Sequence, residues 1–105
     1  MAKNLLLYAY SGYDEGQKNK ILQYFGDLND LTIALIEDAV IGASKKEIEQ
    51  TYKAFLERGI KVLCLEEDFR ARGYNSEGLA ENINLINYDS LIDEIANAGK
   101  IISWT

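Results

Sequence analysis

Most of the side chains that could do chemistry gather in one segment near the middle of the chain. Cys64, the only cysteine, stands in an apolar run, and three acids at positions 66–68 follow it almost directly. Arg70 and Arg72 come next, before a glycine that closes the segment. A thiol can carry sulfur as a persulfide when its thiolate is accessible, whereas a cluster of charged groups can form a contact surface for another molecule. The segment could therefore carry sulfur on Cys64 or form a contact surface.

Cys64 has the sequence environment of a core residue. It lies between Leu63 and Leu65, where burial disfavours the charged thiolate, and the acids that follow raise its pKa further. The chain contains no histidine that could activate the thiol. We therefore interpret Cys64 as a small buried hydrophobe. The alternative hypothesis is a sulfurtransferase-like enzyme in which Cys64 itself carries persulfide.

Cofactor and metal motifs are missing from the sequence. It has no dinucleotide-binding glycine motif, no Walker loop and no Ser-His-Asp set. The loop at 10–14 is similar to a phosphate-binding loop, but Asp14 and Glu15 place negative charge where phosphate would bind. A single cysteine excludes an internal disulfide and, with no histidine, argues against a zinc site. We expect neither metal nor cofactor.

Five short apolar runs predict the strands that position this segment. They are near-continuous rather than alternating, which is typical of strands covered on both faces. The runs lie at residues 5–10, 31–36, 60–65, 83–86 and 101–104. Because helical spacing separates them, we predict one α/β domain over residues 1–105. It has three layers, with a mostly parallel five-stranded sheet and helices on both faces, in a flavodoxin-like arrangement.

The helical segments carry recognisable start and stop signals. Residues 44–47 read as a capping box before an apolar stripe that runs to Gly59. Gly26 stands where a left-handed cap would end the first helix, and Asp89 or Ser90 is expected to cap the last one. The loop at 74–82 is expected to be mobile.

The charge of the chain limits its partners. The net charge is −6, and the eleven basic residues are scattered, so we expect no direct binding to nucleic acid or to an anionic membrane. The sequence contains no run of about 18 apolar residues, so we expect no transmembrane helix. It shows no basic segment followed by an apolar one, so we expect no secretory signal. We expect a cytoplasmic protein.

The acidic segment resembles the TusB/DsrH family of small sulfur-relay subunits. In that family an apolar strand ends in a Glu-Asp pair and then an Ala-Arg-Gly, as residues 61–73 do here. Residues 35–43 upstream, and residues 83–92 and 101–104 downstream, also resemble the family's pattern and occur in the same order. The resemblance implies a DsrEFH-like fold over nearly the whole chain.

The resemblance also implies a function. Members of the family assemble with DsrE/TusD-like and DsrF/TusC-like paralogues, commonly as a heterohexamer, and pass sulfur towards tRNA 2-thiouridine synthesis or sulfur oxidation. The DsrE/TusD-type partner carries the essential cysteine. Some DsrH-type members have a cysteine near their first loop, but residues 11–16 contain none here. We therefore expect a non-catalytic companion subunit rather than a sulfur carrier.

Aromatic and charged residues follow several of the expected strands. The carboxyl ends of parallel strands meet at one edge of a sheet, and tyrosines and tryptophan among charges are favoured at protein interfaces. The simpler alternative is that each residue only covers the core or caps a helix. A further alternative is a self-associating small-molecule binder that uses the same edge. The candidate interface residues are Tyr10, Tyr13, Asp38, Glu67, Asp68, Arg70, Arg72, Tyr88 and Trp104.

Overall fold

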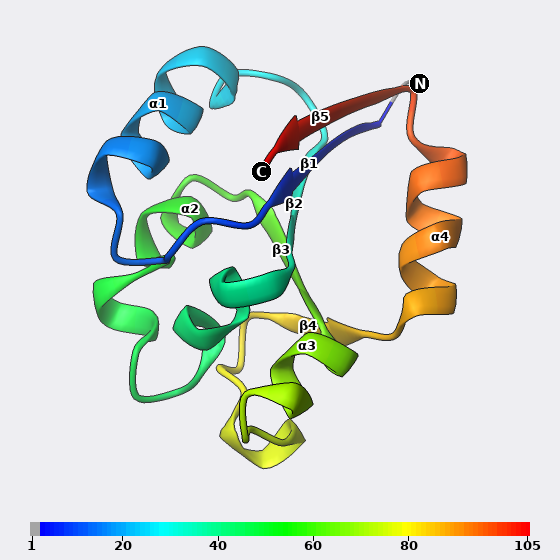
Figure 1. Cartoon of the computed structure of the whole chain (residues 1–105). Coiled ribbons are helices and arrows are strands. Elements are labelled where there is room, and N and C mark those ends of the chain that lie inside the picture. The colour runs from blue at the N-terminus through cyan, green and yellow to red at the C-terminus, as the bar shows by residue number, and fades with distance from the viewer. Residues whose placement is uncertain (1–2) are drawn as a thin grey trace.

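A five-stranded sheet lies between two layers of helices in the computed structural model, which describes residues 3–105 (Figure 1). All four strand pairings are parallel, and the strand order is β4-β3-β2-β1-β5. The strands are β1 (Asn4–Tyr8), β2 (Leu31–Leu35), β3 (Lys61–Leu65), β4 (Asn84–Ile86) and β5 (Lys100–Trp104). The predicted three-layer α/β class is confirmed, although flavodoxin itself has the order 2-1-3-4-5.

The helices are distributed unevenly over the two faces of the sheet. The chain steps from β1 to β4 in one direction and then returns past β1 to β5, so right-handed crossovers place the last connection on the opposite face. Only α4 (Tyr88–Asn97) lies in that return connection. The other elements are α1 (Glu15–Phe25), η1 (Glu37–Ala43), η2 (Ile48–Gln50), α2 (Lys53–Glu57), α3 (Glu66–Ala71) and η3 (Ser76–Gly78), where η marks a 3₁₀ segment.

The hydrophobic core is correspondingly lopsided. On the face that carries α1 and α2, seventeen buried residues of the described chain form one cluster, which includes Tyr8, Tyr52 and Phe55. On the α4 face a second cluster has only five buried members. Those five are Leu5, Ala34, Leu63, Leu65 and Leu91. None of the helices in residues 3–105 is long and apolar enough to cross a membrane.

The helix predicted after residue 44 is interrupted. The side-chain oxygen of Ser44 is buried without a hydrogen-bond partner, so the expected capping box does not form. The chain instead makes the short η2, a break and the short α2. At the break, the Thr51 hydroxyl donates to the carbonyl of Gly42 at 2.6 Å and also contacts the carbonyl of Glu47. These contacts attach the segment to η1 at the expense of a continuous helix.

Two helix ends also differ from the sequence-based expectation. Asn87 caps α4, because its side-chain oxygen accepts from the N–H of Ser90 at 2.9 Å, so neither Asp89 nor Ser90 is the cap. Gly26 follows α1 in a right-handed conformation with φ of −61°. Asp14 caps the start of α1, since its carboxylate accepts from the N–H of Gln17 at 3.1 Å.

Candidate interaction surface at the carboxyl edge of the sheet

The candidate residues lie at or just beyond the carboxyl ends of their strands, as the sequence predicts. Because all the strands are parallel, these ends lie at one edge of the sheet. Tyr10 and Tyr13 follow β1, Asp38 lies in η1 after β2, and Tyr88 begins α4 after β4. The charged segment after β3 forms the helix α3 rather than a turn, and it carries Glu67, Asp68 and Arg70, with Arg72 at its end. Trp104 is the last residue of β5.

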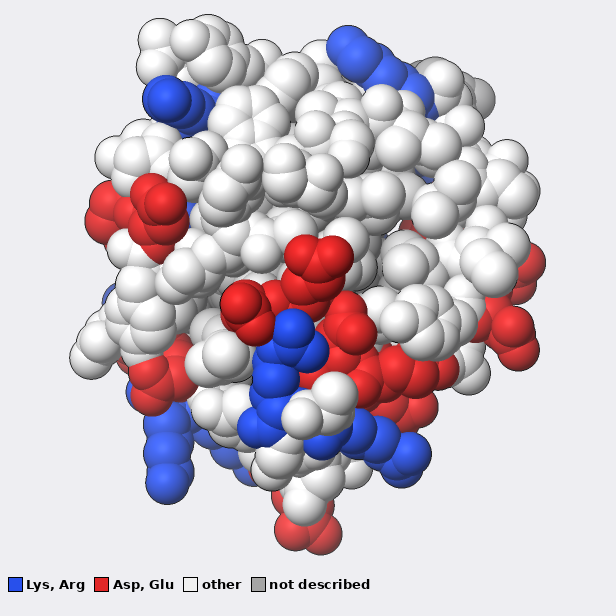
Figure 2. Space-filling view, in the orientation of Figure 1, with Lys and Arg blue, Asp and Glu red and all other residues white. Residues whose placement is uncertain are grey.

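Two of the charged residues hold α3 against η1. The carboxylate of Asp68 accepts from the N–H of Glu37 at 2.6 Å, and Glu37 has a left-handed φ of 53°, which is uncommon outside glycine. Arg72 donates to the carboxylate of Asp38 at 3.0 Å and to the carbonyl of Asp68 at 3.1 Å. Basic side chains therefore run through an acidic cluster at this edge (Figure 2). The side chains of Arg72 and Asp68 therefore bind other parts of this chain, whereas Arg70 is exposed.

Glu67 joins α3 to α4. Its Oε2 accepts from the N–H of Tyr88 at 3.2 Å, while its Oε1 is buried and has no hydrogen-bond partner. The connections that leave β3 and β4 diverge here, since α3 packs on one face of the sheet and α4 on the other. Glu67 therefore connects α3 and α4 at the point where the chain leaves two neighbouring strands for opposite faces of the sheet.

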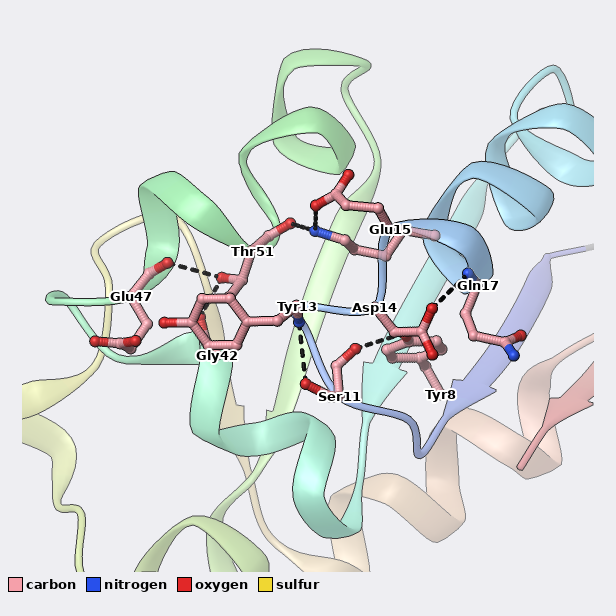
Figure 3. A network of polar contacts seen from close by, with 10 residues as sticks. Tyr8, Ser11, Tyr13, Asp14, Glu15, Gln17, Gly42, Glu47 and Thr51 are labelled. Atoms are coloured by element: carbon pink, nitrogen blue, oxygen red, sulfur yellow. Dashed lines mark hydrogen bonds and ion pairs between the residues drawn. The ribbon is translucent and has the colours of Figure 1, made fainter.

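The loop after β1 is held by its own hydrogen bonds (Figure 3). The Tyr8 hydroxyl donates to the carbonyl of Ser11 at 2.8 Å, and the hydroxyl of Ser11 accepts from the N–H of Tyr13 at 3.1 Å. Gly12 and Gly42 both pack on the ring of Tyr52, and a Cβ at either glycine would come within 2.9 Å of that ring. Close packing therefore requires glycine at both positions.

A buried lysine connects α1 to the segment that carries η2. The Nζ atom of Lys18 donates to the carbonyl of Thr51 and pairs with the carboxylate of Glu15 at 2.8 Å. The pairing satisfies the charge of a side chain that is almost fully inside the protein. Lys18 stands three, four and seven residues before Ile21, Leu22 and Phe25, so helical spacing places it on the apolar face of α1, where a charged residue is not expected.

The aromatic candidates divide into exposed and internal groups. Tyr10, Tyr13 and Tyr88 are 40–50% exposed at the edge. Beside Tyr13 lies a shallow hollow of about 360 Å³, which residues of the first loop and η1 line. Trp104 is partly buried, because its indole N–H donates to the side chain of Gln17 at 2.8 Å and its ring packs edge-on against Phe25. The tyrosines are thus the aromatic groups that this edge offers to a partner.

The placement of Cys64 in the core is confirmed. Its side chain is fully buried among the larger of the two clusters. Burial, with a smaller contribution from the charge of Asp68, raises the pKa of the Cys64 thiol to about 12. At pH 7 the thiolate is then on the order of one molecule in 10⁵. No group of three or more histidine, cysteine or acidic side chains in residues 3–105 is arranged to hold a metal ion.

The fold and the edge together define a small α/β protein with a polar and aromatic surface at the carboxyl ends of a parallel sheet. The sequence profile described as "DsrH like protein" matches residues 11–101, and the chain belongs to this family. The resemblance of the sequence to the TusB/DsrH family is confirmed.

Two solved structures are similar to the chain over most of its length. The crystal structure of the ychN protein from E. coli has a TM-score of 0.75 and 17% identity, with 99% of this chain and 100% of that chain covered. The solution NMR structure of Tm0979 from Thermotoga maritima has a TM-score of 0.58 and 28% identity, covering 89% of this chain and 91% of the other. No curated protein matches the chain. The structural likeness at 17% identity establishes the fold alone.

Proposed function

We propose that this chain is a non-catalytic subunit of a cytoplasmic sulfur-relay complex. It assembles with cysteine-bearing DsrE/TusD-like and DsrF/TusC-like paralogues, in a relay that ends in tRNA 2-thiouridine or in sulfur oxidation. Membership of the DsrH-like family supports the sulfur-relay role. The observation that carries the companion role is the state of Cys64, which is fully buried and has a raised pKa, while residues 11–16 hold no second cysteine.

The carboxyl edge is the surface proposed to meet the paralogues. Three tyrosines are exposed there, and tyrosine buries a large area at little cost in side-chain entropy. The loops beneath them are held by the Asp68 and Arg72 contacts and by the Ser11 hydrogen bonds, so little ordering is needed on binding. A partner's cysteine loop placed against this edge would meet a fixed set of carboxylates and aromatic rings.

The test is co-purification of the tagged chain from its source cells, followed by mass spectrometry. Wild-type chain is expected to recover related small subunits, at least one with a cysteine in a loop. The double variant Tyr13→Ala/Tyr88→Ala is expected to lose them, because it removes two exposed rings while leaving the backbone N–H bond to Glu67 in place. Tyr24→Ala is the matched control, since Tyr24 is 63% exposed but lies on α1, away from this edge.

Equal melting temperatures of the variants would show that any loss is not unfolding. Recovery of the chain by itself, or the same subunits from the double variant as from wild type, would contradict the proposal. Asp68→Ala is unsuitable as an interface test, because Asp68 holds the N–H of Glu37 within the chain.

A further inference from the structure

One face of the parallel sheet is incompletely covered. Five strands at a spacing of about 4.8 Å make a sheet roughly 24 Å wide, whereas α4 is a single helix about 10 Å across and about 15 Å long. Parallel sheets are almost always covered on both faces. Here Leu7, Ile36 and Ile86 on the α4 face remain partly exposed. Ile101 pairs with Leu5 of this face and is also exposed at the β5 edge.

The outward side of α4 continues this apolar surface. Tyr88 and Ile92 are one turn apart, and Ile92 is 60% exposed, more than most large apolar side chains. Asp89 and Asp93, which are also four residues apart, form the neighbouring row on the helix surface, and both are exposed. The helix therefore presents a short apolar ridge with carboxylates along one side.

All the charged side chains of α4 are acidic. The helix carries Asp89, Asp93 and Glu94 and no lysine or arginine. The next basic residue, Lys100, begins β5 beyond the end of the helix, at the opposite edge of the sheet from Tyr88. Two copies packed about a two-fold axis through this ridge would bring the acids of both helices into one interface with no lysine or arginine from either helix, which disfavours a second copy as the occupant.

We propose that the outward side of α4 is a second docking surface, which takes a related subunit through an apolar ridge flanked by lysine or arginine. This inference rests on the proposed companion role and adds a second surface, which adjoins the carboxyl edge at Tyr88 and extends along α4 away from it. Covering Ile92 and the open part of the sheet supplies the apolar contact, and the acids select a basic partner over another copy of this chain. With two such surfaces, one chain can contact two neighbours in the complex.

The probe is the related subunit that co-purifies with wild-type chain, expressed and purified by itself and titrated at low and at high salt. Ile92→Asp is expected to weaken binding at least about tenfold, because it places a charge in the middle of the ridge. Asp93→Lys is expected to weaken binding several-fold at low salt and much less at high salt, because it reverses a flanking charge. Tyr24→Asp is the control, with similar exposure on α1, and is expected to bind within about twofold of wild type.

Both α4 variants should keep the wild-type urea midpoint. Their positions are exposed, and Asp93→Lys places a cation four residues after Asp89, which favours the helix. Binding of Ile92→Asp that equals the control would overturn the inference while leaving the companion role intact. Tighter binding of Asp93→Lys would overturn the basic partner, and self-association of pure chain that Ile92→Asp abolishes would make the occupant a second copy. If no related subunit co-purifies, the proposed function fails and this inference fails with it.

Discussion

The burial of Cys64 makes a quantitative prediction about its reactivity. The perturbation is alkylation of the thiol by iodoacetamide at neutral pH, in the folded protein and in urea. In the unfolded chain the thiol has a pKa near its ordinary value of 9.0, whereas in the folded protein the pKa is about 12. The fraction present as thiolate is therefore about 10³ times smaller in the folded protein.

A more basic thiolate is a better nucleophile, and this offsets part of the loss. With a Brønsted coefficient of about 0.45, a pKa difference of about 3 restores a factor of roughly 20. The electrostatic effect alone then leaves the folded protein about fiftyfold slower. Because the side chain is fully buried, the reagent must also wait for a local opening, so about fiftyfold is the smallest slowing that we expect.

The assay follows the intact mass of the protein over time at one reagent concentration. A variant with Cys64→Ala and Ser76→Cys serves as the control, because residue 76 is exposed and its thiol should react at nearly the same rate in the native protein and in urea. Native alkylation of Cys64 within about tenfold of the rate in urea would refute the reasoning. It would also revive the alternative in which Cys64 carries persulfide.

Other predictions concern the residues that fix the edge. Asp68→Ala should lower the free energy of unfolding by about 1–2 kcal/mol in urea titrations, since it removes the acceptor for the Glu37 N–H, while Arg70→Ala should stay within about 0.5 kcal/mol. Tyr52→Phe should cost about 1–2 kcal/mol, because it leaves the buried carbonyl of Ala39 without its 2.6 Å donor. Burial raises the pKa of Tyr52, so its protonated form stabilises the fold fully below pH about 10, and this contribution is lost as the pH rises further. Stability measured above pH 10 should therefore fall, and less steeply in Tyr52→Phe; an unchanged slope would contradict this assignment.

The sheet was predictable because its signal is local. The buried strands β2 and β3 read as continuous apolar runs, and the expected ranges 31–36 and 60–65 differ from the observed strands by one residue each. The helix after residue 44 was not predictable, since its stripe at Tyr52 and Phe55 is real but packing of Thr51 on Gly42 interrupts the backbone. The break in this helix depends on a tertiary contact, which no local sequence pattern indicates.

The edge was predictable as a location but not as a network. Parallel strands place the candidate residues together, so the sequence is sufficient for that step. Whether a charged residue at this edge stabilises the fold depends on contacts between residues more than thirty positions apart. Examples are Arg72 with Asp38 and Asp68 with Glu37. The left-handed backbone at Glu37 leaves no signature in the sequence either.

The measurement that tests the companion role most directly is the location of sulfur in the purified complex. The complex is loaded with a cysteine desulfurase and cysteine, and the intact mass of each subunit is then recorded for wild type and for Cys64→Ala. We expect one added sulfur atom on a partner's loop cysteine, none on this chain, and equal loading in both complexes. Added sulfur on Cys64, or loading that Cys64→Ala abolishes in a folded complex, would contradict the account.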